Sequence, residues 1–394
     1  MPSTTSYLLI GLVAAVATFV FTPLVGRVAR RVGWVAEPGE RRIHAVATPD
    51  VGGIAMFVGF IAALAAARLN DRFDTIFARN TDEPRGLLFA AALMFLVGLI
   101  DDIREISAPA KVVGTIAAAG VLTYYGVTMF YFRVPFVEVF NITDDWLLLV
   151  TVIWLLGMSQ AINLIDGLDG LAAGIVAIGA LAFFIYSLRL AAPSVGLLPS
   201  PSIGPLVAII TVGICVGFLP HNFNPARIFM GDGGSLLLGL LLAVSTSVVG
   251  GRADPNLRGY AGQTYFFLAP LFIPLFILGV PILDTFFAII RRATRRQGVA
   301  TADKRHLHHR LMEMGHGQRR SVVILWAWTA LLSAFVLYPV LTQSFVSYVP
   351  IGAAMLGLLL YTLFHPQIRR IRAAPDDSGL STEDPGLHTE DPPG

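Results

Sequence analysis

The chain has 394 residues, of which 55% are hydrophobic and only 14% are charged. Soluble domains carry about 25% charged residues, so this composition excludes an ordinary soluble protein and indicates an integral membrane protein. The formal net charge of +2 argues against a nucleic-acid partner, and the single cysteine, Cys215, excludes an intramolecular disulfide and a cysteine metal site.

Eleven apolar runs along the chain are candidates for membrane-spanning helices. They are continuously apolar, which favours helices over the alternating strands of a membrane barrel. The expected fold class is therefore all-α, a polytopic membrane protein with about eleven transmembrane helices. The predicted spans are 6–27, 51–68, 86–100, 112–131, 146–162, 171–188, 205–219, 234–250, 264–290, 321–341 and 347–364.

The distribution of basic residues predicts the orientation. The first charged residue, Arg27, stands at the far end of the first run, which places the N-terminus outside. An odd number of spans then makes the C-terminus cytoplasmic, and the inside segments hold 20 of the 28 Lys and Arg residues.

Residues 1–372 would form one transmembrane domain with cytoplasmic active-site loops. Residues 373–394, rich in Pro, Gly, Asp and Glu, would be a disordered cytoplasmic tail.

Two adjacent acids, Asp101 and Asp102, directly follow the third apolar run. Such a pair can simply mark the membrane boundary. Adjacent carboxylates also suit a hard cation, or a carboxylate base beside one.

A second polar cluster lies between the fifth and sixth runs. Asn163, Asp166 and Asp169 recur every three residues, so they would share one face if the turn is helical. The alternative is a polar turn with glycines.

A third cluster runs from Asn222 to Ser235 and contains Asp232 in the segment Gly231-Asp232-Gly233-Gly234 at the start of the eighth run. Backbone N–H groups at a helix N-terminus bind phosphate, and the carboxylate beside them would take Mg²⁺. Acting only as the helix N-cap is the alternative role for Asp232.

The loop after the ninth run combines arginines with histidines. Arg291 and Arg292 come first, followed by His306, His308 and His309. The arginines alone are explained as positive-inside anchors, and three histidines suggest a zinc site, but these three cannot all face one point on a regular helix. An anion-binding loop for a diphosphate is the better prediction.

All four clusters fall on the predicted cytoplasmic face. Mg²⁺ characteristically uses one or two carboxylates together with substrate phosphates. An acidic site with a basic rim therefore predicts phosphoryl-group chemistry on a nucleotide substrate.

As a set, these motifs resemble the polyprenyl-phosphate N-acetylhexosamine-1-phosphate transferases of glycosyltransferase family 4, which are related to phospho-MurNAc-pentapeptide translocase. The resemblance rests on Asp101-Asp102 with Lys111, on residues 163–171 and 229–235, and on His306-Leu-His-His309. It begins at His44 and Pro49-Asp-Val-Gly-Gly53 and covers most of the chain. The His-x-His-His form is more similar to the N-acetylglucosamine branch.

The resemblance implies transfer of N-acetylglucosamine-1-phosphate from UDP-N-acetylglucosamine to a polyprenyl phosphate, undecaprenyl or decaprenyl, with release of UMP. Such a reaction at the bacterial inner (plasma) membrane would start cell-envelope polysaccharide synthesis, whether of lipopolysaccharide, arabinogalactan or teichoic acid. A homodimer is compatible with the resemblance.

The resemblance also implies roles for single residues. Mg²⁺, replaceable by Mn²⁺, would be held by Asp232 and Asn163. Asp101 or Asp102 would handle the lipid phosphate as base or positioner. Phosphates would be bound by Lys111, Arg291, Arg292 and the histidine loop, and the uridine by Asp169 and Asn222, with Asp166 lining the same pocket. The translocase branch has a Lys before its Thr-Pro motif where this chain has Ala45-Val46-Ala47, so Arg41, Arg42 or His44 would have to serve there.

Two alternatives to this prediction stay open. One is transfer of phospho-MurNAc-pentapeptide within the same family. The other is a membrane transporter or flippase, which would place polar groups and broken helices near the midplane, where this chain has only Asp284 as a candidate. A non-catalytic scaffold would not need acids and histidines gathered on one face.

Overall fold

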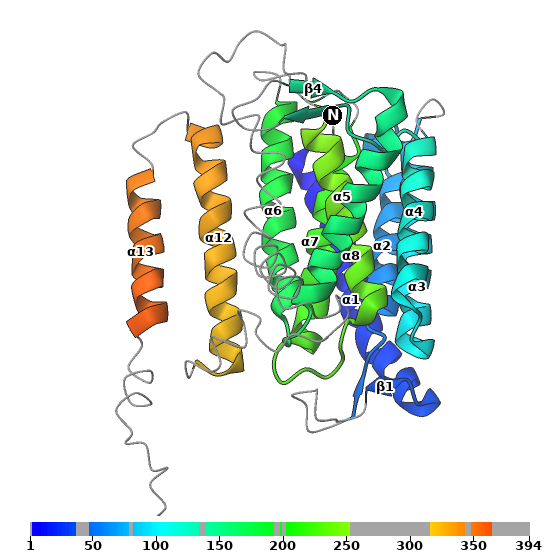
Figure 1. The fold of residues 1–394 in the computed structure, drawn as a ribbon, viewed down its shortest axis with the longest axis vertical. Helices are drawn as coiled ribbons and strands as arrows, with labels where there is room; N and C mark the ends of the chain where they lie inside the picture. The colour runs from blue at the N-terminus through cyan, green and yellow to red at the C-terminus, as the bar shows by residue number, and fades with distance from the viewer. Residues whose placement is uncertain are drawn as a thin grey trace, which may run out of the picture.

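The computed structural model describes residues 2–36, 47–78, 82–133, 139–192, 198, 202–252, 316–342 and 348–364. Long helices stand side by side in one bundle, with α12 and α13 at its edge (Figure 1). The helices are α1 Thr4–Val32, α2 Gly53–Arg68, α3 Glu83–Arg104, α4 Ala108–Tyr124, α5 Asp144–Ile165, α6 Leu171–Ala191, α7 Gly204–Asn222, α8 Gly231–Gly250, α12 Gln318–Thr342 and α13 Tyr348–Phe364, with a short 3-10 helix η1 at Asp71–Phe73.

Helix α8 is the core of the bundle, because nearly all of its side chains are buried and it packs against α3, α5 and α7. Close approach of backbones elsewhere depends on small residues. A Cβ added at Gly217 of α7 would lie 2.2 Å from the carbonyl oxygen of Ala15 in α1. Small residues at such crossings are how membrane helices pack without a hydrophobic driving force.

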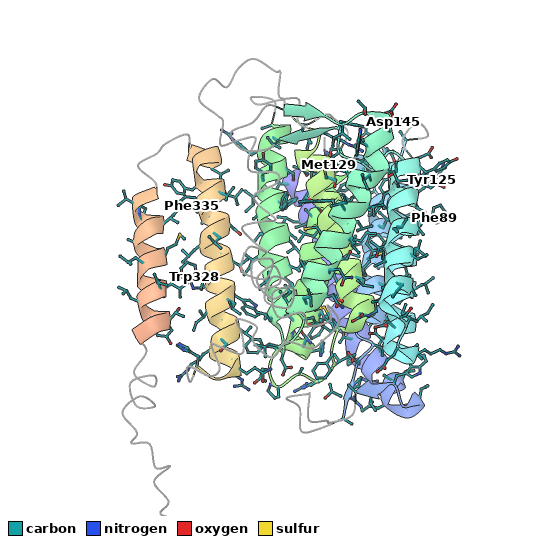
Figure 2. The ribbon with its side chains drawn as sticks, in the orientation of Figure 1. Phe89, Tyr125, Met129, Asp145, Trp328 and Phe335 are labelled. Carbon is teal, nitrogen blue, oxygen red and sulfur yellow. The ribbon has the colours of Figure 1, made fainter. Side chains whose placement is uncertain are left out.

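The outside of the bundle is apolar, as a lipid-facing surface requires. Side chains of α1 such as Leu12, Val16 and Val20 are about half exposed. Phe89 and Tyr125 lie side by side on the α3–α4 edge, with ring centroids 5.9 Å apart (Figure 2). Seven described helices are long and apolar enough to cross a membrane, and three shorter apolar helices accompany them.

Ten of the eleven predicted spans coincide with described helices. The ninth, 264–290, and the tail 373–394 lie outside the described residues, so the count of eleven and the disordered tail stay predictions. The predicted span 112–131 is wrong at its end, because α4 stops at Tyr124 and Gly126 adopts a left-handed φ of 74° that turns the chain.

Two small antiparallel pairs interrupt the otherwise helical fold. Strands β3 Tyr131–Arg133 and β4 Val139–Asn141 pair after α4, with Phe132 opposite Phe140. Strands β1 Val35–Ala36 and β2 Thr48–Pro49 pair between α1 and α2, with Val35 opposite Pro49. The all-α expectation did not include these pairs.

The two ends of the bundle differ in chemistry. The end that holds the N-terminus in Figure 1 is clamped by Arg252, which donates to Glu83 at 2.5 Å and to the carbonyl oxygen of Thr128 at 3.2 Å. The opposite end, where β1 and β2 lie, gathers the loops after α3, α5 and α7. The three described acidic clusters therefore meet at one end of the bundle.

Candidate active site

The start of α8 is held by a carboxylate from α3. The backbone N–H of Asp232 donates to Asp102 Oδ1 at 2.6 Å, and that of Gly233 donates to Asp102 Oδ2 at 3.0 Å. Asp102 thus satisfies two free donors of the helix N-terminus with its two oxygens. We expected the backbone N–H groups at the start of this helix to bind phosphate, and that expectation is wrong for the N–H groups of Asp232 and Gly233. Asp232 is also not the N-cap, because α8 begins at Gly231 after Met230.

Glycines let three helices converge on this point. A Cβ at Gly98 of α3 would lie 2.3 Å from the carbonyl oxygen of Asp232, and one at Gly53 of α2 would lie 2.3 Å from the nitrogen of Gly234. The chain before α2 is joined to the chain before α8, since Gly53 N–H donates to Met230 O at 2.8 Å. The Pro49–Gly53 segment of the sequence therefore fixes where α8 begins.

Four predicted site residues, from four different helices, form one polar centre. Lys111 Nζ of α4 lies 2.7 Å from Asp101 Oδ2 of α3 and 2.5 Å from Asp232 Oδ2 of α8. Asn163 Nδ2 of α5 donates to Asp232 Oδ1 at 2.7 Å and to Ser235 Oγ at 3.0 Å. The side chains of Lys111, Asp101 and Asp232 are only 23%, 15% and 23% exposed, so the centre is sheltered yet reachable.

Asp166 adds a further carboxyl group beside this centre. Helix α5 ends at Ile165 and Asp166 is its C-cap, so the expected helical face through Asn163, Asp166 and Asp169 is wrong beyond Ile165. Desolvation by burial raises the pKa of Asp166 well above its ordinary value, and repulsion from Asp50, Asp232 and other acids adds to the rise. Such a concentration of carboxyl groups favours binding of a cation.

Asp169 and Asn222 brace the loop that leads to α8. Asp169 Oδ2 accepts from Asn224 Nδ2 at 2.9 Å and from the N–H of Ala226 at 3.0 Å. Asn222 accepts from Gly170 N–H and donates to the carbonyl oxygen of Ile228, each at 3.0 Å. Both side chains are almost fully buried. Their predicted contact with uridine stays a prediction, while their contact with loop 223–230 is direct.

Several residues of this region were not predicted from the sequence. Arg319 at the start of α12 donates from Nε to Asn224 O at 2.9 Å, which links α12 to loop 223–230. Nothing in the sequence around Arg319 points to that contact. Asp50 and Ser235 lie inside the segments 49–53 and 229–235, on which the family resemblance rests, so their place in these motifs could have identified them as site residues.

A family model described as glycosyl transferase family 4 matches residues 85–250, which run from α3 through α8. A decaprenyl-phosphate N-acetylglucosaminephosphotransferase of Mycobacterium leprae (strain TN) is 37% identical over 358 residues, covering 90% of this chain and 88% of that protein. The chain belongs to glycosyl transferase family 4. This confirms the family resemblance drawn from the motifs.

Two further members of the family are similar over less of the chain than the Mycobacterium leprae relative. A probable undecaprenyl-phosphate N-acetylglucosaminyl 1-phosphate transferase of Bacillus subtilis (strain 168) is 36% identical over 80% of this chain and 80% of its own length. A phospho-N-acetylmuramoyl-pentapeptide-transferase of Staphylococcus epidermidis is 28% identical over 63% of this chain and 78% of its own length. The family core matched at 85–250 contains all four residues of the polar centre.

Part of the predicted site of this glycosyl transferase lies outside the described residues. This applies to His44, Arg291, Arg292, His306, His308 and His309. Their roles stay predictions. Within the described chain, α12 begins at Gln318, and its Arg319 joins the start of α12 to loop 223–230 at the acidic end of the bundle.

The donor chemistry of the polar centre fits Mg²⁺. Among the described residues no three His, Cys, Asp or Glu side chains are arranged as a complete metal site. Mg²⁺ does not need one, because it takes one or two protein oxygens and fills the remaining positions with phosphates and water. Asp232 offers a carboxylate, and Asn163 would have to turn its Oδ1 toward the ion, since Nδ2 faces Asp232.

Proposed function

We propose that this protein transfers N-acetylglucosamine-1-phosphate from UDP-N-acetylglucosamine to a polyprenyl phosphate in a Mg²⁺-dependent reaction that releases UMP. The observation that carries the proposal is the polar centre of Asp101, Lys111, Asn163 and Asp232 at one end of an apolar bundle. The relatives named for N-acetylglucosamine transfer to decaprenyl or undecaprenyl phosphate support the substrate pair.

The reaction makes one phosphorus–oxygen bond and breaks another. An oxygen of the lipid phosphate attacks the phosphorus that bears the sugar, and the bond from that phosphorus to the bridging oxygen of UMP breaks. Both reactants are anions, so the site has to neutralise charge and hold the two phosphates in line. Bound Mg²⁺ supplies two positive charges for this purpose.

The residues of the chain have separable roles in this proposal. Asp232 and Asn163 would hold the ion, and Lys111 would neutralise a phosphate. Asp101 orients Lys111, and its other oxygen is fixed by the N–H of Ile106 at 2.8 Å. Asp102 holds α8 in place through two backbone donors. Loop 223–230, braced by Asp169 and Asn222, would form the wall on which the nucleotide lies.

The setting of the site suits a lipid acceptor. The polar centre lies at one end of helices whose outer faces are apolar, so a polyprenyl chain would stay in the membrane while its phosphate reaches the centre. We place this end on the cytoplasmic side of the bacterial plasma membrane, where UDP-sugars are made, and the basic-residue distribution supports this orientation.

The test is UMP release by purified protein supplied with undecaprenyl or decaprenyl phosphate and one UDP-sugar at a time. UDP-N-acetylglucosamine should be turned over only with a divalent ion present, and UDP-MurNAc-pentapeptide should not react. Turnover of the pentapeptide substrate in place of UDP-N-acetylglucosamine would assign the protein to the other branch. Turnover in excess EDTA would contradict the metal dependence.

A further inference from the structure

Lys111 holds the oxygen of Asp232 that a divalent cation would need. Its ammonium lies 2.5 Å from Asp232 Oδ2 and 2.7 Å from Asp101 Oδ2. The other oxygen, Asp232 Oδ1, accepts from Asn163. Both oxygens of Asp232 are therefore engaged by donors, and a cation can bind this carboxylate only by displacing one of them.

The geometry points to Lys111 as an exchangeable counter-ion: a divalent cation at Asp232 displaces the Lys111 ammonium, which stays tethered to Asp101 and turns toward the phosphate of a substrate. The inference rests on the proposed metal site and adds to it a competition between the protein's own cation and the metal. No covalent bond changes in this exchange. One ammonium–carboxylate contact is replaced by a metal–carboxylate contact.

The second oxygen of each carboxylate partner of Lys111 accepts from a different kind of donor, a backbone N–H at Asp101 and the side-chain amide of Asn163 at Asp232. Asp101 is fixed by the N–H of Ile106 through Oδ1, so its Oδ2 is a fixed anchor for the ammonium. The donor on Asp232 is a side-chain amide, which can turn its oxygen toward the same Mg²⁺ ion, so Asp232 is the partner that is open to metal binding. A doubly charged ion at about 2.0–2.1 Å attracts a carboxylate more strongly than an ammonium does at hydrogen-bonding distance. The exchange should therefore release Lys111 from Asp232 and leave its contact with Asp101.

The choice of lysine at this position supports a movable cation. The chain contains 28 Lys and Arg residues, of which only Lys111 and Lys304 are lysines. Arginine binds carboxylates as a rigid planar fork, whereas lysine is a compact charge on a flexible four-carbon stem. Although nearly all other basic residues of the chain are arginines, the basic residue between these two carboxylates is a lysine, whose flexible stem can shift its charge without moving its helix.

The direct test is Mn²⁺ binding to the purified full-length protein without substrate, followed by electron paramagnetic resonance. Lys111→Met, which keeps the length and removes the charge, should bind Mn²⁺ at least about tenfold more tightly than the wild type while losing turnover. Arg104→Met is the matched control, because Arg104 is exposed at the end of α3 and also near the acids in sequence. Its Mn²⁺ affinity should equal that of the wild type.

Asp232→Asn distinguishes a failure of the Lys111 exchange from a failure of the proposed metal site. It should lose Mn²⁺ binding if Asp232 is the metal ligand. Loss in Asp232→Asn together with unchanged or weaker binding in Lys111→Met would overturn the exchange and leave the proposed metal site standing. Wild-type Mn²⁺ binding by Asp232→Asn would overturn both.

A second measurement avoids any loss of folding in the Lys111 variant. In the wild-type protein, modification of Lys111 by an amine-reactive reagent, quantified by mass spectrometry, should increase several-fold when Mn²⁺ is added, because the released ammonium loses one carboxylate partner. The increase should be absent in Asp232→Asn. Lower or equal modification of Lys111 with Mn²⁺ would contradict the exchange.

Discussion

At the scale of single residues, two neighbouring acids have different partners. Asp101 contacts the ammonium of Lys111 and the N–H of Ile106, whereas both oxygens of Asp102 accept backbone N–H groups of α8. Asp101 therefore positions the positive charge of Lys111, and Asp102 positions the start of α8. An isolated pair of acids at a helix end would show neither pattern, so the interpretation of this pair as a simple membrane-boundary marker is wrong.

Replacement of each acid by its amide should separate these roles. Asp101→Asn should release Lys111 and Asp102→Asn should misplace the start of α8, and each change should reduce the rate of UMP release by at least about a hundredfold. Asp102→Asn should also lower the free energy of unfolding by roughly 1–3 kcal/mol, because its amide NH₂ would face a backbone N–H and leave a donor unpaired. Rate assays with thermal unfolding of the same samples check both effects. Near-wild-type rates in both variants would remove the pair from the catalytic site.

At the scale of elements, the site depends on how closely α3 approaches the start of α8. The approach is possible because Gly98 has no side chain, and its added Cβ would lie 2.3 Å from Asp232 O. Displacement of α8 by even about 1 Å would move Asp232 away from Lys111 and Asn163, and misplacements of this size reduce enzymatic rates strongly.

A matched pair of glycine replacements tests this dependence. Gly98→Ala should reduce the rate of UMP release by about a hundredfold or more. Gly120→Ala in α4 is the control, because a Cβ there meets nothing within 4 Å. The control should retain full activity and should be slightly more stable, by about 0.5–1 kcal/mol. Equal activity of the two variants would show that the α3–α8 contact is not critical.

The contact between α12 and loop 223–230 belongs to the same scale. Arg319 donates to the backbone oxygen of Asn224, and Asn224 donates to Asp169. Arg319→Ala should raise the KM for UDP-N-acetylglucosamine several-fold and change the KM for the lipid little, because the loop faces the nucleotide side in the proposed function. Arg319→Lys, which can still donate to the carbonyl oxygen, should recover part of the loss. A change confined to the lipid KM would contradict this assignment.

At the scale of the whole molecule, the topology follows from the alternation of helices. The loops after α3, α5 and α7 share one end, while the N-terminus and the Arg252–Glu83 pair lie at the other. If the acidic end is cytoplasmic, cysteine introduced at exposed Thr75, which follows α2, should react with an impermeant thiol reagent in intact cells. Cysteine at exposed Arg104 should react only after permeabilisation, and buried Cys215 should remain silent. Labelling of Arg104→Cys from outside would reverse the orientation.

The helices were largely predictable because membrane spans are continuous apolar runs, and ten of them coincide with described helices. The end of α4 was not predictable, since residues 125–131 are apolar enough to continue a span. Only the left-handed backbone conformation of Gly126 in the structure shows the turn. Apolar composition does not distinguish a helix from a short hairpin at the membrane edge.

The site was predictable as a set of residues but not as a set of contacts. The acids and amides stood out because charged groups are rare in this chain. The pairing of Asp102 with α8 spans 130 positions, and that of Arg319 with Asn224 spans 95. Contacts at that separation depend on how the helices pack, which local sequence patterns do not encode.

The role of Asp232 in a Mg²⁺-dependent transfer reaction is tested most directly by measuring UMP release by Asp232→Ala across a Mg²⁺ titration. In this variant, Mg²⁺-dependent release of UMP from UDP-N-acetylglucosamine and polyprenyl phosphate should be abolished, while the protein still inserts into the membrane and unfolds cooperatively. Substantial turnover with an unchanged Mg²⁺ dependence would contradict it and would move the metal to Asp101, Asp102 or Asp169.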